Sequence, residues 1–242
     1  MAITIVASVF GSSAGGSTGI TLVYAGSAEN DIAVTFGGFA GGTATAPGVV
    51  SPSGYTSIYS RDAADSDFKV EWKRLGATPD PSVLLAASGD AADAVGYGAY
   101  VLRGVDTSAN PFDMSPLVTT SITATGVPKA PSVITATNGA IVIAMGGNDV
   151  LDATPGVIPN FSANIGGSTN DTDDFSFAGA VSILGTAGTL NPTIWSTWAS
   201  GAYVTVTTAL KPYIVPAEPV TQFEFAGQYS NLPPHVRNKV TI

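Results

Sequence analysis

The sequence predicts an all-β protein, a jelly-roll-like β-sandwich with an extended Pro-rich C-terminal arm. Short runs of β-branched and aromatic residues recur between turn residues, and no segment keeps a helical period. The composition of strands and turns, with 28 Gly and 16 Pro in 242 residues, agrees with this. We expect ten to fourteen short strands, a sandwich domain at residues 1–210 and an arm at residues 211–242.

The charge of the chain limits the partners that it can have. There are 18 acidic and 9 basic residues, a net charge of −9, which opposes contact with a phosphate backbone, so we expect no nucleic-acid partner. The chain has no Cys, and therefore no disulfide or thiolate metal site. No apolar run has the length of a membrane span and no basic residue precedes Arg61, so we expect neither a membrane segment nor a secretory signal.

The strands of the first half are predicted from alternating and apolar runs. Ile20–Tyr24 and Ile32–Phe39 are expected to pair as a hairpin, and residues 37–54, rich in Gly, Ala, Thr and Pro, are expected to form a long surface loop. The sharpest alternation lies in Phe68–Leu75, where apolar and charged residues take turns. It predicts one face in the core and one face in water.

The segment from Val95 to Leu102 is almost wholly apolar, which predicts a central strand buried on both faces. A charged corner follows. Gly104 suits a backbone position with positive φ, and Arg103 and Asp106 are close enough in sequence to pair across the bend or to bond its backbone groups. We interpret Arg103, Gly104 and Asp106 as a structural corner of the sandwich.

The second half continues with short β-branched segments. Asn138-Gly139 has the composition of a two-residue hairpin turn between two of them. The expected strands are Val118–Ala124, Ser132–Thr137, Ala140–Met145, Phe175–Leu184, Ile194–Ala199 and Ala202–Leu210. Trp195 and Trp198 are expected to pack in the core.

The C-terminal arm is predicted from five Pro residues, which cannot donate to a β-ladder, at positions 212, 216, 219, 233 and 234. Phe223, Phe225, Tyr229 and His235 are its candidate partner-binding residues, because exposed aromatic side chains are costly unless they dock. Docking on the protein's own sandwich and docking on a neighbouring subunit both remain open.

No catalytic residue is predicted. Residues 11–15 match the letters of a GxSxG nucleophile elbow, but a further Gly/Ser run follows instead of a helix, and the single His, His235, lies in the arm. Ser66 and Lys69 have SxxK spacing but lie in a strand pattern.

No cofactor is predicted either. Asp171, Asp173 and Asp174 could supply oxygen ligands for Ca²⁺, as could the acidic loop with Asp149 and Asp152. Neither loop has the spacing of a known calcium loop, and we favour solvated acidic turns.

Four segments carry a resemblance to a known family: NDIAVTFGGF (30–39), SGYTSIYSR (53–61), AYVLRGVDTSANPFD (99–113) and AIVIAMGG (140–147). Their order resembles a β-sandwich domain of tailed-bacteriophage virion proteins, in which a GDxxVA-like strand, a GWT-like element and a YRGVD-like corner with a following PxD succeed one another. Tyr55 stands where that pattern more often has Trp, and Leu102 where it more often has Tyr. The resemblance covers about residues 20–147.

The resemblance implies a non-enzymatic virion protein, made in the bacterial cytoplasm, and no catalytic residue to carry over. We expect a capsid decoration or cement protein on the head exterior, a homo-oligomer that binds other virion proteins through its arm. The alternative is a tail appendage or fibre-associated adhesin that binds host surface glycans through Tyr or Trp residues and loops such as 37–54. A glycan hydrolase ranks third, because no carboxylate pair stands out.

Overall fold

The computed structural model describes residues 2–13, 19–39, 49–61, 67–87, 94–149, 154–169 and 175–215, and within these ranges the protein is an antiparallel β-sandwich without helices, which confirms the predicted fold class. Its strands are β1 (Thr4–Ser13), β2 (Gly19–Val23), β3 (Ile32–Phe39), β4 (Val49–Val50), β5 (Thr56–Arg61), β6 (Asp67–Arg74), β7 (Ser82–Ala87), β8 (Val95–Arg103), β9 (Phe112–Gly126), β10 (Val133–Ile134), β11 (Ile141–Asn148), β12 (Ser162–Ser168), β13 (Ser176–Ile183), β14 (Thr189–Leu190) and β15 (Gly201–Leu210).

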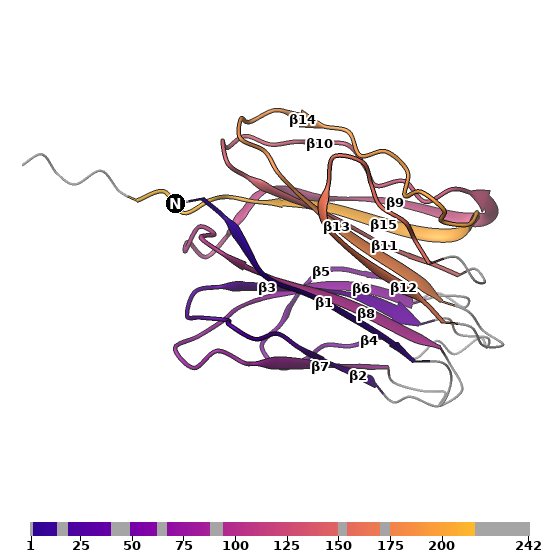
Figure 1. Ribbon diagram of the computed structural model, residues 1–242, viewed down its shortest axis with the longest axis horizontal. Coiled ribbons are helices and arrows are strands. Elements are labelled where there is room, and N and C mark those ends of the chain that lie inside the picture. Colours follow the sequence, from indigo (N-terminus) through magenta and orange to yellow (C-terminus); the bar gives the residue numbers. More distant parts are fainter. Residues whose placement is uncertain are drawn as a thin grey trace, which may run out of the picture.

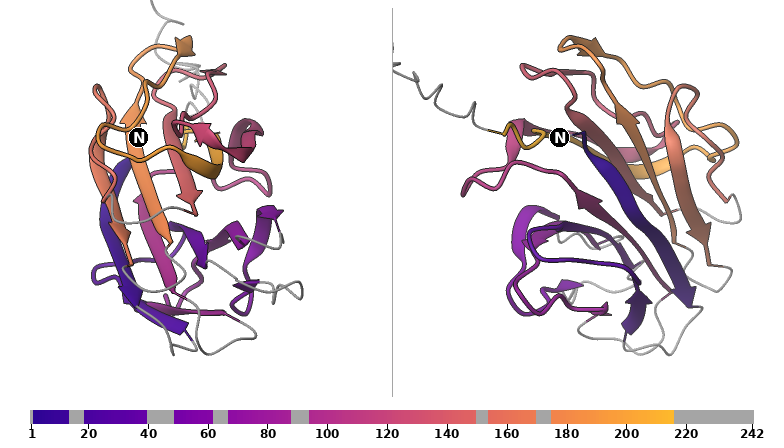
Figure 2. Two further views of the ribbon diagram at one scale, coloured as in Figure 1. Left: turned by 90° about the vertical axis from the view of Figure 1, so that its right-hand side faces the viewer. Right: turned by 60° about the vertical axis from the view of Figure 1, so that its left-hand side comes forward.

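The strands are stacked in four layers (Figure 1). The two inner layers are five-stranded sheets with the orders β1-β8-β3-β6-β5 and β12-β13-β11-β15-β9. The small sheet β2-β7-β4 lies on the outer side of the first, and the pair β10-β14 lies on the outer side of the second. Figure 2 shows the same separation from two other sides, with the N-terminal half of the chain in one part of the molecule and the C-terminal half in the other.

The main core lies between the two inner sheets, because alternate residues of their central strands point toward each other. Every residue from Val95 to Leu102 is buried, as the sequence predicts for a strand enclosed on both faces. The largest contributors from the other central strands are Ile32, Val34, Phe36, Ile141, Ile143 and Met145.

The two halves of the described chain repeat one topology. Strands β1, β2, β3, β5, β6, β7 and β8 of the first repeat (residues 4–103) correspond in order to β9, β10, β11, β12, β13, β14 and β15 of the second (residues 112–210). With this correspondence the sheet β1-β8-β3-β6-β5 becomes β9-β15-β11-β13-β12, the observed order of the other inner sheet read in reverse. The outer pair β2-β7 becomes β10-β14 in the same way.

Register and loop bonds extend the repeat to single residues. Ile32 lies opposite Arg74 in β3 and β6, as Ile141 lies opposite Ile183 in β11 and β13. The backbone N–H of Asn30 donates to the Leu75 carbonyl at 2.9 Å, and at the corresponding point Gly139 donates to Leu184 at 2.8 Å. Such bonds are repeated far from the sheet centres too, since Tyr24 donates to Pro81 and Thr135 donates to Gly188.

Irregular positions are repeated as well. Asn30 and Gly139 both have positive φ, at 68° and 77°, and so do Gly54 and Asn160, at 79° and 68°, in turns that precede β5 and β12. The pairing register of the first strand of each repeat shifts near the start of the strand. In β1 the shift lies between Ile5 and Ala7. In β9 it lies between Phe112 and Met114, which pair with Leu210 and Ala209. Because bulges and left-handed residues are costly unless the fold requires them, their recurrence supports the repeat independently of strand order.

Several predicted pairings are wrong. β2 pairs with β7 rather than forming a hairpin with β3, and β3 lies between β6 and β8. The expected hairpin around Asn138-Gly139 is absent, because β10 pairs with β14 while β11 pairs with β13 and β15. Gly139 keeps the left-handed conformation of a turn, so the local signal was correct and only the strand partner differed.

Three further expectations are corrected. Residues 37–39 end β3 and residues 49–50 form β4, so the expected loop at 37–54 is shorter than predicted; residues 40–48 lie outside the described ranges. The charged face of β6 is not in water: Glu71 is 2% exposed beneath the β2-β7-β4 layer. Residues 194–199 form no strand, although Trp195 and Trp198 are buried as expected.

The last strand ends at Leu210, and the chain then crosses toward the first repeat. Pro212 forms a bridge with Val105, and Tyr213 donates its backbone N–H to the Gly104 carbonyl at 2.7 Å. The described part of the chain contains no helix with the length and apolar character that crossing a bilayer requires.

Candidate functional site

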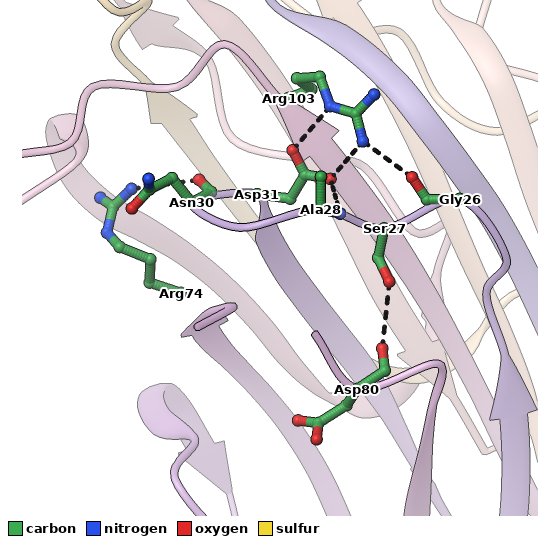
Figure 3. Close-up of polar contacts among 8 residues, drawn as sticks. All are labelled: Gly26, Ser27, Ala28, Asn30, Asp31, Arg74, Asp80 and Arg103. Carbon is green, nitrogen blue, oxygen red and sulfur yellow. Dashed lines mark hydrogen bonds and ion pairs between the residues drawn. The ribbon is translucent and has the colours of Figure 1, made fainter. Parts of the chain in front are cut away.

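The corner after β8 is held by an ion pair between two strands that are adjacent in space and distant in sequence (Figure 3). The Arg103 guanidinium donates to both carboxylate oxygens of Asp31, from Nε at 3.0 Å and from Nη2 at 2.9 Å, and Nη2 also donates to the Gly26 carbonyl at 2.8 Å. Asp31 is 1% exposed and accepts a further bond from the Ala28 N–H. A buried carboxylate with this many donors ties the 26–31 turn to β8.

Arg103 therefore does not pair with Asp106, the nearer carboxylate in sequence. Asp106 accepts bonds from the backbone and hydroxyl of Ser108 and pairs with Lys211 at 3.2 Å. These bonds, the Ser108 backbone bond foremost, hold the pKa of Asp106 below its usual value. The carboxylate closes the 106–108 turn and fixes the point where the chain leaves the sandwich.

The backbone of this corner requires a glycine at position 104. Its φ is +83°, and a Cβ there would lie 2.5 Å from the Ala2 carbonyl oxygen. Both the left-handed conformation and the close approach of the first residues exclude a side chain.

Arg74 joins the two loops of the corner. Its guanidinium donates to the Asn30 carbonyl at 3.3 Å, to the Asp106 carbonyl at 2.7 Å and to the Ser108 carbonyl at 3.2 Å. Burial lowers the pKa of Arg74. The corner is thus a set of charged side chains that bind one another and the neighbouring backbone.

A cleft of about 520 Å³ opens beside the corner, between the 51–55 turn and β7. Lys73 and Asp80 form an ion pair in it at 2.6 Å, and the Lys73 Nζ lies 5.7 Å from the centre of the Tyr55 ring. The Ser53 carbonyl accepts a bond from Lys73, and the exposed Leu84 forms an apolar wall. The cleft offers a donor, acceptors, a ring and an aliphatic surface at one place.

Tyr55, which lines this cleft, is paired with Tyr24. The hydroxyls of Tyr24 and Tyr55 are 3.0 Å apart, and burial raises the pKa of both. Both phenols therefore stay neutral at physiological pH and act as polar packing groups.

A buried polar cluster lies deeper, on the outer face of the first inner sheet. Lys69 is 3.6 Å from Glu71 and donates to the Ser51 hydroxyl at 2.6 Å. The Tyr97 ring lies against Gly37, where a Cβ would be 2.7 Å from it, and its hydroxyl has no partner among the described side chains and backbone. Burial raises the pKa of Tyr97, and the nearby Asp67 and Glu71 carboxylates raise it further.

Most of the other predicted site residues lie outside the ranges that the structure describes. Phe223, Phe225, Tyr229, His235 and the acidic residues Asp171, Asp173 and Asp174 lie outside the described ranges, as does Ser66. Ser12 and Ser13 continue β1, and Asp149 follows β11. Among residues whose placement is described, no group of three His, Asp or Glu side chains is close enough to share a metal ion.

The sequence reasoning missed Asp31 as the partner of Arg103, and it missed the pairing of Lys73 with Asp80. Asp31 carried one usable signal, since it is the second residue of the first resembling segment and directly precedes an apolar strand. Lys73 was assigned to a solvent face, and no local signal reveals the layer that covers it.

Comparison of the chain with protein-family models, with curated proteins and with solved structures gave no match in any of the three.

Proposed function

We propose that this protein is a non-enzymatic structural component of a tailed-bacteriophage virion, a decoration or cement protein on the head exterior that is present in many copies. One observation carries the proposal. Asp31, from the NDIAVTF segment, and Arg103, from the LRGVD segment, belong to separate parts of the family resemblance and form a single two-bond ion pair. The resembling segments therefore work as one structural unit instead of as unrelated short matches.

The other residues of the resembling corner are used in the same way. Asp113, the Asp of the PxD element, accepts the backbone N–H groups of Ala136 at 2.6 Å and Thr137 at 3.3 Å. With Asp106 closing the 106–108 turn, each charged residue of the pattern binds backbone or a charged partner. A signature built of scaffold bonds supports a structural role.

The experiment that tests this proposal is immunogold labelling of intact virions of the source phage. Label spread over the head supports a decoration protein. Absence of label from particles, with the same antibody detecting the denatured protein in infected cells, would contradict any virion role.

A second candidate function, recognition of a host surface glycan by a tail appendage, is favoured by the cleft at Tyr55, Lys73 and Asp80. Sugar sites combine a ring or aliphatic face with a few fixed donors and acceptors, which this cleft has. Gold label confined to the tail would favour this candidate. In that case Asp80→Ala should abolish binding of the protein to host cells, while Glu29→Ala, which removes an exposed carboxylate outside the cleft lining, serves as the matched control.

A further inference from the structure

The two edges of the sandwich are built from equivalent strands. One edge is formed by β1 and β12 and the other by β5 and β9, and in the repeat β9 corresponds to β1 and β12 to β5. β1 and β12 contact each other and close their edge, whereas the described residues of β5 and β9 make no comparable contact. Equivalent pairs of strands thus form both edges of the sandwich, but only the pair β1 and β12 closes its edge.

The open side contains a groove of about 490 Å³, here called the edge groove, lined by residues 56–58, Trp72, Asn110 and residues 112–116. Trp72 from the first inner sheet and Phe112 from the second meet edge to face, with ring centres 5.4 Å apart. Both side chains and Ile58 are only partly buried and pack against the main core. Core side chains therefore reach the surface here, which is unfavourable unless something covers them.

The chain itself contains a segment that fits this groove. In residues 220–225, VTQFEF, Phe223 and Phe225 alternate with Gln222 and Glu224, the period of a strand with one apolar face. An added strand can pair its backbone with the free edge of β5 and place alternate side chains between the sheets.

The path of the described chain favours a groove on another copy. Lys211 still bonds to the Pro111 carbonyl beside the groove, but Tyr213 bonds to Gly104, on the corner of the first repeat. Ile214 and Val215 are then 71% and 62% exposed, so the last described residues do not pack back over Phe112.

We propose that the edge groove between β5 and β9 receives residues 220–225 of a neighbouring copy, with Phe223 and Phe225 inserted beside Trp72 and Phe112. This rests on the proposed structural role and names the contact that joins subunits. An arm exchanged between copies gives each subunit one donated strand and one received strand, which is a head-to-tail contact that can continue through an assembly.

The absence of Cys from the chain permits a clean cross-linking test with the full-length protein. Thr56 is exposed in the groove lining, and the double variant Thr56→Cys/Glu224→Cys should form disulfide-linked dimers and larger species under mild oxidation. Ser162 starts the equivalent strand on the closed edge, so Ser162→Cys/Glu224→Cys is the matched control and should remain monomeric. A synthetic VTQFEF peptide should abolish the linked species, and a peptide with both Phe replaced by Ser should not.

Two outcomes would overturn the proposal. A disulfide formed within single chains would place the arm in its own groove, and equal cross-linking in the groove variant and its control would show that the groove does not select the arm. Neither outcome bears on where the protein lies in the virion, which the gold labelling decides separately.

Discussion

The two repeats share strand order, register and turns, yet their outer faces are filled in different ways. In the second repeat, Ala144 lies opposite Ala180, and Trp195 and Trp198 cover these small residues as an edge-to-face pair with centres 5.0 Å apart. In the first repeat, the corresponding residues Thr35 and Glu71 are polar and buried, and they share the outer face of the sheet with an apolar cluster that includes Leu22, Val83 and Leu85.

A glycine shows how the same backbone serves both arrangements. Gly146 makes room for the Trp198 ring, and its counterpart Gly37 makes room for the Tyr97 ring, although the two rings come from different elements. Basic residues are also distributed unequally between the repeats. The second repeat contains Lys129, and Lys211 directly follows its last strand, whereas the first repeat contains Arg61, Lys69, Lys73, Arg74 and Arg103. Both repeats have an apolar outer core, and the first also carries buried polar groups, the corner and the cleft.

The largest difference between the repeats is expected at alkaline pH. Burial raises the pKa of Tyr24, Tyr55, Tyr97 and Tyr100, all in the first repeat. The unfolded chain ionises these phenols near pH 10, so the stability that depends on their neutral form is complete below that pH and is lost as the pH rises through the folded pKa values. Tyrosinate absorbance should therefore rise together with the loss of near-UV circular dichroism.

The Tyr97→Phe variant provides the control for this prediction, because it removes one ionisable group whose hydroxyl has no partner in the described ranges. Its stability should fall less steeply above pH 10. Full tyrosinate absorbance with an unchanged near-UV spectrum would show that the four phenols are accessible in the folded protein.

The next largest effect on stability is expected from removing one of the two buried tryptophans of the second repeat. Trp195 is 1% exposed, and Trp195→Ala should lower the free energy of unfolding by about 3–5 kcal/mol, because it removes buried surface and leaves a cavity. Urea denaturation measures this change, and Trp195→Phe should cost clearly less. A loss no greater than that of Leu84→Ala, which removes an exposed side chain in the first repeat, would contradict the burial of Trp195 in the outer core of the second repeat.

The corner should be more sensitive than its counterpart. Arg103→Leu leaves the Asp31 carboxylate, 2% exposed, without its cation, and should lower the thermal midpoint. Lys211 occupies the corresponding place after β15 and pairs with the more exposed Asp106, so Lys211→Leu should lower the midpoint less. Equal shifts in a thermal melt would mean that the buried ion pair does not distinguish the repeats.

The smallest effect is expected from exchanging the two left-handed turn residues. Asn30 and Gly139 hold the same place before the central strands, with φ of 68° and 77°. Because Asn and Gly both tolerate this conformation, Asn30→Gly and Gly139→Asn should each change the free energy of unfolding by less than about 1 kcal/mol. Gly139→Val, measured in the same urea series, should cost more; equal costs would argue against a positive φ in solution.

Sequence reasoning succeeded where the signal is local. The apolar run Val95–Leu102 and the alternation in Phe68–Leu75 each identified a strand, since side-chain period is set by the backbone of the segment itself. It failed where the answer depends on a partner. β3 was paired with its neighbour in sequence, whereas in the fold it lies between β6 and β8.

The repeat cannot be recognised in the amino-acid sequence, for a physical reason. Because a position in a sheet constrains the size and polarity of its side chain only loosely, equivalent positions of the two repeats can hold residues as different as Thr35 and Ala144. A tetrapeptide that the two repeats share is misleading. GAYV begins at Gly98 and at Gly201, yet Gly98 lies opposite Phe36, whereas the residue opposite Met145, the counterpart of Phe36, is Val206.

The sequence by itself determined that the chain is all-β, where most of its strands lie, and that Gly104 and Gly139 adopt left-handed turns, because these depend on composition, period and local sterics. Only the tertiary structure decided that two repeats face each other, that Arg103 binds Asp31 and not Asp106, and that Glu71 is covered. Those features depend on which strands meet and in which register, and a local pattern cannot encode a partner that lies seventy residues away in the chain.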